Sequence, residues 1–412
     1  MKRRARICFR AMTATWPRAI ATGSGISAIL LLVALVLSMS STPPNVVMPH
    51  RTAPTVGAGT RGAASSVRHA RRPSVRAPMT FYVAPSGRDS NRGTSPSRPW
   101  RTVGRVNRAS LRPGDRVLFE GGATFSDDTL MPGFGYAVSG ASGHPIVFGS
   151  YGSERARLTQ GVWLGTNASH PDGPSYLTFE KLALGPVRGF QATGDYITLR
   201  GLRISHLVGP QSRQETGIAS EGSHWVIEDN AIYDTGDSGM LLGFQASASG
   251  DPAGGVDYLV AGNVVSHTGL DNAISYAKHA IYVKVADARV DNNRLTYFHD
   301  DGVSLRYRNA SIVHNYIAHG LIGIAWYQYD SLPGTTELIG NTIAFTDQAA
   351  IFVCGVAESC VQPTENFVVS HNLLHSTRGE ALNLQPTSGT YVVQSNLGLD
   401  GVVVKPPLVP VG

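Results

Sequence analysis

Cysteine, lysine and long stretches with helical spacing are scarce in this chain of 412 residues. Its three cysteines leave too few ligands for a cysteine-based metal site. The second half of the chain holds short β-branched runs of about three to five residues and no long apolar pattern at helical spacing, which argues against a helical architecture. Acidic residues are missing from one region, because residues 1–78 contain no Asp or Glu.

The first 78 residues are expected to lie outside the fold. Six basic residues precede an almost wholly apolar run from Ile26 to Met39, a pattern typical of an export signal or an uncleaved N-terminal membrane anchor. We expect the signal or anchor over residues 1–40, a disordered basic linker rich in Pro, Ala and Ser over 41–78, and one folded domain over 79–412. Positive charge before the apolar run places the domain outside the cytoplasm, either secreted or anchored at the outer face of the cytoplasmic membrane.

The basic character of the chain belongs to this N-terminal segment. Of the 35 Lys and Arg, 12 lie in residues 1–78, which leaves 23 against 29 acidic residues, a net charge of −6 for the remainder. The basic residues of the domain form no single-sign cluster, so no nucleic-acid partner is expected. A solvated basic linker is the favoured interpretation of the linker arginines, and a tether to membrane or cell wall is the alternative. We expect the domain to be a monomer.

Asparagine recurs through the second half of the chain in one frame: apolar, two residues, Asn, one residue, apolar. The steps between these residues are 33, 30, 22, 26, 31 and 24, so a coil of fixed minimum length carries loops of different size. Such a repeat is typical of a solenoid, whereas a β-sandwich would space its turns about 8 to 12 residues apart. Asn tolerates left-handed backbone angles and its amide can bond the next coil, so the sequence predicts a parallel β-helix with an asparagine ladder at one corner. The ladder residues are Asn230, Asn263, Asn293, Asn315, Asn341, Asn372 and Asn396.

The first residues of the domain carry a family resemblance. Residues 81–125 combine an extended start, a Gly/Asn/Ser-rich loop, a Pro-Trp corner, a short helix expected over Thr102 to Ala109, and a PGD turn into a strand. Together with residues 144–161 and the Asn repeat, this segment resembles secreted right-handed parallel β-helix proteins of the pectate-lyase-like superfamily. The resemblance implies an all-β, single-domain right-handed parallel β-helix with a short N-terminal capping helix, and an extracellular protein directed at carbohydrate.

When the coils are aligned, equivalent residues of successive coils form columns of side chains. Two columns of the strand after the Asn corner are predicted to face the core, and Trp326 is predicted to pack there rather than bind sugar. Lys284, Arg306 and Tyr327 end consecutive strands in an outward column. Coils lie about 4.8 Å apart, so these three side chains are predicted to be neighbours on a solvent-facing sheet.

The concentration of lysine is the strongest local signal of a site. Only four lysines follow the linker, and two of them, Lys278 and Lys284, fall within seven residues of each other. Two like charges on adjacent coils repel, which suggests that an acidic polysaccharide docks at Lys284 and Arg306. Solvation, or balance by Asp300, Asp301 and Glu221, would also account for the two charges.

A second resemblance concerns residues 281–308, which are similar to the catalytic stretch of the chondroitinase-B-like and alginate lyase family. In that family a Lys on one coil acts as base and an Arg one coil later assists, which implies these roles for Lys284 and Arg306. The sequence departs from the family at Tyr307, where a His is expected, and near Ala277 and His279, where calcium-binding carboxylates are expected. Calcium is therefore left open as a cofactor.

A lyase would cleave a uronate polymer by β-elimination. Lys284 would act as base if neighbouring charges lowered its pKa, Arg306 would clamp the carboxylate, and Tyr282 or Tyr327 would protonate the leaving oxygen. His279 is a rival base. Loops over residues 244–255 and 327–336 are expected to frame the groove. The predicted substrate-binding residues are Lys278, Tyr327, Asp300, Asp301, Arg308 and Tyr329.

Two other functions remain open. A glycoside hydrolase would use Asp300 and Asp301 as its carboxylate pair, although the other motifs of the polygalacturonase type are missing. A non-catalytic wall-binding or adhesive β-helix would stack exposed tyrosines on sugar rings. Finally, Cys354 and Cys360 are predicted to close a small loop by a disulfide in an oxidising compartment, and free thiols are the alternative.

Overall fold

The structure, a computed structural model, describes residues 76–209, 215–246, 253–271, 278–329, 332–355, 364–401 and 403. The predicted signal or anchor, nearly all of the linker, and Cys360 lie outside these residues. Residues 73–412 belong to one compact unit. Within the described residues, no helix is long and apolar enough to cross a membrane.

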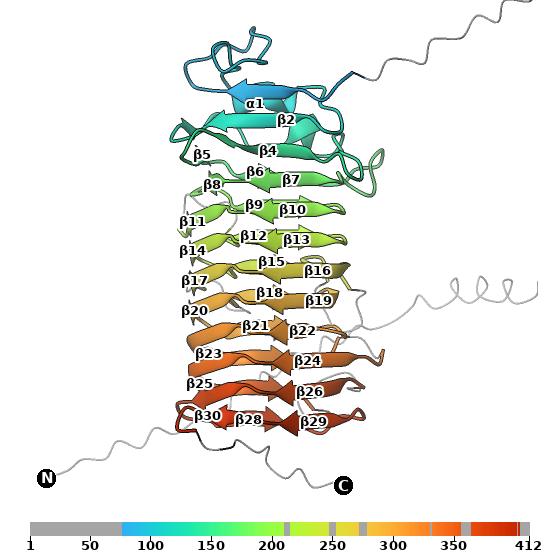
Figure 1. Ribbon diagram of the computed structural model, residues 1–412, viewed down its shortest axis with the longest axis vertical. Helices are drawn as coiled ribbons and strands as arrows, with labels where there is room; N and C mark the ends of the chain where they lie inside the picture. The colour runs from blue at the N-terminus through green and yellow to red at the C-terminus, as the bar shows by residue number, and fades with distance from the viewer. Residues whose placement is uncertain are drawn as a thin grey trace, which may run out of the picture. The chain divides into compact units, whose positions relative to one another are not determined.

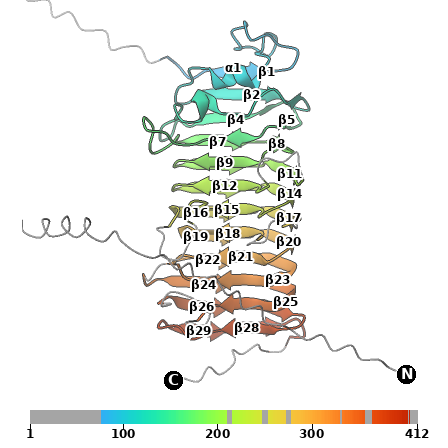
Figure 2. The ribbon, with the colours of Figure 1, turned by 180° about the vertical axis from the view of Figure 1, so that it is seen from behind.

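The described chain winds into a stack of coils in which every pairing between named strands is parallel. Figure 1 shows the coils following one another from the blue N-terminal coil to the red C-terminal coil, and Figure 2 shows the stack from behind. Each coil contributes a strand to one 12-stranded sheet. Its strands are β1 (Thr80–Val83), β2 (Arg116–Glu120), β4 (Ile146–Tyr151), β7 (Leu177–Glu180), β10 (Ile197–Arg200), β13 (Trp225–Glu228), β16 (Val256–Ala261), β19 (Ala286–Asp291), β22 (Ser311–Val313), β24 (Thr335–Ile339), β26 (Asn366–Ser370) and β29 (Tyr391–Gln394).

The other strands form an 18-stranded sheet that consists of two ladders. The long strands β23 (Tyr316–Trp326) and β25 (Thr342–Val353) run through both ladders and join them. The ladder that follows the Asn corner contains β3 (Thr124–Phe125), β5 (Ala156–Leu158), β8 (Leu182–Leu184), β11 (Arg203–Leu207), β14 (Ala231–Thr235), β17 (Val264–Thr268), β20 (Arg294–Phe298), β27 (Leu373–Ser376) and β30 (Leu397–Gly398). The other ladder, here called the site ladder, contains β6 (Val162–Trp163), β9 (Phe190–Thr193), β12 (Ile218–Glu221), β15 (Met240–Leu242), β18 (Ile281–Val283), β21 (Asp301–Leu305) and β28 (Glu380–Leu384). The predicted parallel β-helix is confirmed.

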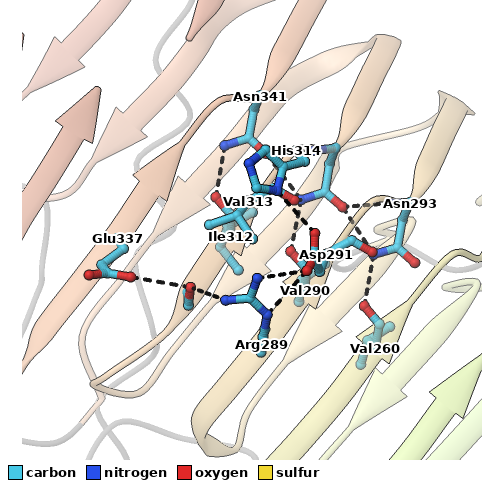
Figure 3. A network of polar contacts seen from close by, with 12 residues as sticks. Val260, Arg289, Val290, Asp291, Asn293, Ile312, Val313, His314, Glu337 and Asn341 are labelled. Carbon is cyan, nitrogen blue, oxygen red and sulfur yellow. Dashed lines mark hydrogen bonds and ion pairs between the residues drawn. The ribbon is translucent and has the colours of Figure 1, made fainter. Parts of the chain in front are cut away.

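The asparagine ladder is present over all seven predicted residues. From Asn263 on, each side-chain oxygen accepts from the backbone N–H and side-chain amide of the preceding rung, as between Asn293 and Asn315 at 2.9 and 3.0 Å. Each amide also donates to a carbonyl in an earlier strand, for example from Asn315 to Val290 at 2.9 Å. Figure 3 shows this network between Asn293 and Asn341. Buried polar groups cost free energy unless they are paired, and here the rungs pair with one another.

The backbone at this corner corrects one detail of the prediction. The left-handed residue is the one before each Asn, not the Asn itself. Five of the seven preceding residues are not Gly, which shows that a side chain fits there in spite of the strain. The preceding residues and their φ angles are Asp229 (55°), Gly262 (66°), Asn292 (53°), His314 (56°), Gly340 (67°), His371 (57°) and Ser395 (57°).

The two predicted inward columns face the core, but they lie on the site ladder, one strand beyond the strand that directly follows the Asn corner. Register pairs Ile281 with Val303 and Val303 with Ile324, and all three side chains are fully buried. Trp326 is also fully buried and packs edge-on against Phe367 with ring centres 4.9 Å apart, so its prediction as a core residue is confirmed.

A short helix lies at the N-terminal end of the stack, as predicted. Helix α1 (Val103–Asn107) begins one residue later than expected, because Thr102 is its N-cap and its hydroxyl accepts from the Arg105 N–H at 3.0 Å. Val103 and Val106 are fully buried, so the helix covers the first coils. A 3-10 helix, η1 (Pro132–Gly135), follows β3.

Candidate functional site

The register of the site ladder brings the predicted site residues together. Tyr282 in β18 pairs with Ser304 in β21, and Leu305 pairs with Trp326 in β23. Lys284, Arg306 and Tyr327 therefore follow equivalent positions on consecutive coils, as the sequence predicts. Figure 1 shows β18, β21 and β23 one after another in the stack.

The expectation of a solvent-facing column is wrong. The titratable groups of this region are covered, with relative exposures of only 4% for His279, 6% for Lys284, 4% for Asp301 and 7% for Arg306. The segment after β15 lies nearby: Ala246 packs in one cluster with Tyr307, and the Gln245 N–H donates to Glu221 at 2.9 Å. Charges taken out of water need compensating partners, so the contacts of each group decide what the site can do.

Arg306 lies in a cage of tyrosine rings. Its guanidinium carbon is 4.6 Å from the ring centre of Tyr282, 4.5 Å from that of Tyr327 and 5.4 Å from that of Tyr329. Its Nη1 donates to the Ser304 hydroxyl at 2.8 Å and to the Leu305 carbonyl at 2.9 Å. Arg306 forms no salt bridge with a carboxylate in the described part of the chain. Aromatic rings stabilise a cation, yet they leave its charge unneutralised.

Tyr282 and Tyr329 share a hydrogen bond, with 3.4 Å between their hydroxyl oxygens. Burial raises the pKa of Tyr282 well above its usual range, and the hydrogen bond to Tyr329 adds to the rise. Burial also raises the pKa of Tyr329, but the Tyr282 hydrogen bond and the Arg306 charge outweigh it, so its pKa lies below the usual range. Tyr329 is therefore the phenol that releases its proton more readily.

His279 and Asp301 meet on neighbouring coils at the other side of Tyr282. The His279 ring packs edge-on against Tyr282 with centres 4.6 Å apart, and its Nδ1 lies 3.2 Å from the Asp301 carboxylate. Burial, together with the charges of Arg306 and Lys284, holds the pKa of His279 well below its usual range. The ring is consequently neutral near pH 7, and its contact with Asp301 is not an ion pair.

Burial raises the pKa of Asp301 to about 6, against hydrogen bonding from Ser304 and the charge of Arg306, which lower it. Ser304 thus contacts both the carboxylate of Asp301 and the guanidinium of Arg306. Asp300 is directed elsewhere: its carboxylate accepts from the Lys278 N–H at 2.8 Å and contacts His299 at 2.7 Å. The two adjacent aspartates therefore do not face one another as a pair.

Lys284 stands close to two groups of the site. Its Nζ lies 5.0 Å from the centre of the Tyr282 ring. Burial raises the pKa of Glu221, and the charge of Lys284 lowers it in part. The predicted site therefore extends over three coil steps, from Glu221 in β12 to Asp301 in β21.

Other predicted residues lie at the margins of this cluster. The Lys278 ammonium donates to the Asp271 carbonyl at 2.6 Å. Arg308 is half-buried two residues beyond Arg306, and Tyr307 packs with Ala246 and Ala286. Of the loops expected to frame a groove, the structure describes residues 244–246, 253–255, 327–329 and 332–336.

Three contributions were missed by the sequence reasoning. Ser304 was not among the predicted site residues, although it contacts both Asp301 and Arg306. Tyr329 was expected to bind substrate, whereas its lowered pKa also suits proton transfer. Glu221 was treated only as a balancing charge. The three residues stand in the sequence next to predicted site residues or strand ends, but their contacts follow only from the coordinates of neighbouring coils.

Among the residues that the structure describes, no group of three or more His, Cys, Asp or Glu is arranged to hold a metal ion. Cys354, at the end of β25, is disulfide-bonded. Its predicted partner Cys360 lies outside the described residues, so that pairing stays a prediction.

Comparison with known proteins supports the fold more than the chemistry. No known family profile matches the chain. Over 76 residues it is 38% identical to a lacto-N-biosidase of Bifidobacterium longum subsp. longum, a match of 18% of this chain and 5% of that protein. The chain thus matches a small part of that relative's length.

Among solved structures, a glycoside hydrolase has a TM-score of 0.50 at 10% identity, with 79% of this chain and 98% of that chain covered. A GH136 lacto-N-biosidase from Eubacterium ramulus has a TM-score of 0.47 at 14% identity, covering 78% of this chain and 68% of that one. A rhamnogalacturonan lyase has a TM-score of 0.47 at 15% identity, covering 80% and 87%. The chain has a parallel β-helix fold, and at these identities the likeness concerns the fold alone.

Proposed function

We propose that this protein binds an acidic polysaccharide on the outward face of the site ladder and cleaves it by β-elimination. One observation carries the proposal: Arg306 is buried in a tyrosine cage and makes no salt bridge among the described residues. A buried guanidinium without a carboxylate is costly unless an anion docks against it. A uronate carboxylate fits, because Arg binds carboxylates through paired N–H donors.

The reaction needs a base, an anion clamp and an acid, and the site offers a residue for each. Lys284 takes the proton on the carbon next to the carboxylate, and the electron pair forms the double bond while the C4–O bond breaks. Arg306 stabilises the negative charge that develops on the carboxylate. Tyr329, whose pKa is lowered by the Tyr282 hydrogen bond and the charge of Arg306 despite its burial, gives its proton to the leaving oxygen.

Carbohydrate as the substrate class has independent support. The matched 76 residues of the Bifidobacterium protein belong to a lacto-N-biosidase, and the solved structure at a TM-score of 0.50 is a glycoside hydrolase. Neither specifies elimination. The choice of elimination rests on the cationic, tyrosine-rich composition of the site and on the likeness of residues 281–308 to the alginate lyase family.

Hydrolysis is the second candidate, and Asp301 favours it. A carboxyl group whose pKa is raised to about 6 by burial is suited to act as a general acid. However, Asp300 is bonded to Lys278 and His299 and does not provide the second carboxylate. Elimination therefore accounts for more of the site.

The test is a panel of uronate polymers, including alginate, pectate, glycosaminoglycans and glucuronan, incubated with the protein with and without calcium. Absorbance of an unsaturated uronate on any polymer supports elimination, and we expect Lys284→Ala to abolish it while polymer binding persists. New reducing ends without that absorbance would move the assignment to hydrolysis, which Asp301→Asn would abolish. Binding without either product would leave an adhesive β-helix.

We also propose that the domain acts outside the cytoplasm. The disulfide at Cys354 supports an oxidising compartment, and the apolar run from Ile26 to Met39 supplies the export signal or anchor. Alkaline phosphatase fused after residue 78 should be active in a bacterial host, since it needs export to fold. An inactive fusion would contradict this assignment.

A further inference from the structure

The edge of the site contains a polar atom that has no partner. The Nε2 atom of His279 is buried and makes no hydrogen bond within the described structure. His279 itself is 4% exposed. Almost all buried polar atoms in proteins are hydrogen-bonded, so an exception of this kind calls for a ligand or a function.

The other ring nitrogen determines which state Nε2 is in. The backbone N–H of Asp301 donates to Nδ1 of His279 at 3.3 Å. This backbone hydrogen is fixed in place by the strand, and a second hydrogen on Nδ1 would collide with it. Nδ1 therefore accepts, and in a neutral imidazole the single proton then sits on Nε2.

The surroundings keep the ring neutral. Arg306 and Lys284 both act on His279 with positive charge, Tyr282 packs against the ring, and burial disfavours the imidazolium further. Among the described residues, Asp301 is the acidic group in contact with the ring, and its carboxylate lies on the Nδ1 side. The result is an N–H donor at Nε2 that has no acceptor in the described part of the chain.

We infer that His279 is a substrate-positioning residue that donates a hydrogen bond from Nε2 to a sugar oxygen of the bound polymer. His279 and Arg306 both lie 4.6 Å from the centre of the Tyr282 ring, so the two groups are within twice that distance of each other. One sugar residue whose carboxylate meets Arg306 can place a hydroxyl or glycosidic oxygen at His279. This inference rests on the proposed acidic polysaccharide and replaces the role of base for His279 with that of donor.

The tautomer is measured directly in the free protein. Long-range ¹H–¹⁵N correlation spectra of imidazole-labelled protein at pH 7 should show a proton on Nε2 and a bare Nδ1 for His279, with His279→Gln used to assign the signal. A proton on Nδ1, or an imidazolium, overturns the inference. No substrate is needed for this measurement.

A matched pair of variants tests the donor in binding. The amide of His279→Gln can reach the place of Nε2, whereas the shorter His279→Asn can replace only Nδ1. By calorimetry with oligouronates, we expect the Gln variant to keep most of the wild-type affinity and the Asn variant to bind about tenfold more weakly, as loss of one buried hydrogen bond predicts. Thermal unfolding of both variants confirms that each is folded.

The outcomes separate the two proposals. Equal affinities of the Gln and Asn variants overturn the donor role and leave elimination standing. Binding that depends on His279 in a protein that forms no unsaturated product overturns elimination and keeps the donor. Wild-type protein that binds no oligouronate overturns both.

Discussion

The asparagine corner and the site ladder are both polar regions buried in the same coils, yet they are organised in opposite ways. At the corner every rung donates to one neighbour and accepts from another, as Asn293, Asn315 and Asn341 do. On the site ladder Arg306 lacks a carboxylate and Nε2 of His279 lacks an acceptor within the described residues. Paired groups stabilise the fold, whereas unpaired ones are held ready for a ligand.

The largest expected effect is on activity, from substitution of Arg306 on the site ladder. Arg306→Met keeps an apolar chain in the tyrosine cage but removes the charge, and kcat/KM for the uronate polymer should fall by about 10³-fold. The free energy of unfolding should change little or rise, because an uncompensated buried charge is gone. Rates from product absorbance and urea unfolding measure the two effects. If Arg306→Met lost stability but kept activity, Arg306 would have a structural role rather than the ligand-binding role assigned to it.

Substitution of a rung of the asparagine ladder should have the opposite effect: it should lower stability and leave the binding of oligouronates unchanged. Asn315→Ala removes the acceptor of the Asn293 backbone N–H, one acceptor of the Asn293 side-chain amide and a donor to the Val290 carbonyl, and we expect a loss of about 4 kcal/mol in the free energy of unfolding. Asn396→Ala, at the last rung, should cost less. Urea unfolding compares the variants, and oligouronate affinity should not change in either. Equal losses at both rungs would show that the rungs do not support one another.

The Asp301 carboxylate links stability to pH. Its pKa is raised from 3.8 to about 6, so the folded state holds a proton that the unfolded state has already released between these pH values. This contribution to stability is complete below pH 3.8 and is lost as the pH rises through 6. Asp301→Asn should therefore gain about 2 to 3 kcal/mol relative to wild type between pH 4 and pH 7.

Urea unfolding at the two pH values measures this difference. Asp300→Asn serves as the control, because Asp300 is not fully buried. An identical pH dependence of wild type and Asp301→Asn would mean that the carboxyl group is not desolvated as the structure indicates.

The smallest effect is expected beside the ladder, where Figure 3 shows Arg289 with Asp291. The side chain of Arg289 is 48% exposed, and its ion pair with Asp291 measures 2.7 Å. Arg289→Ala should change the free energy of unfolding by less than about 1 kcal/mol, and by less still in high salt. A cost as large as that of Asn315→Ala would show that charge at the surface, rather than the buried amides, stabilises this corner.

The sequence is informative about the fold because each coil repeats the same physical problem. Asn must satisfy buried backbone groups at every corner, and the inward positions must be apolar, so Trp326 and the seven rungs could be placed without coordinates. The residue before each Asn escaped prediction, since Asp, Asn, His and Ser share no obvious pattern beyond a tolerance of left-handed angles.

The sequence predicted which site residues align on successive coils, but it did not predict their burial or their contacts. Counting coils brought Lys284, Arg306 and Tyr327 into one column, because strand pairing is periodic. The burial of Lys284 and Arg306 could not be predicted, since it depends on side chains that do not repeat from coil to coil, such as the tyrosine rings around Arg306. For the same reason Tyr329 was not recognised as the more acidic phenol: its pKa follows from Tyr282 and Arg306, which precede it by 47 and 23 residues.

The ladder has a direction, because each Asn oxygen faces the preceding rung and each amide faces the following one. Its first oxygen, on Asn230, accepts from the Leu202 N–H of the coil before it. A chain of this kind can be lengthened by whole units: a new coil with an Asn at the corner accepts from one side and donates to the other without disturbing either. Insertion of one coil is therefore an inexpensive way for evolution to lengthen the polymer-binding face while the register of the older coils stays intact.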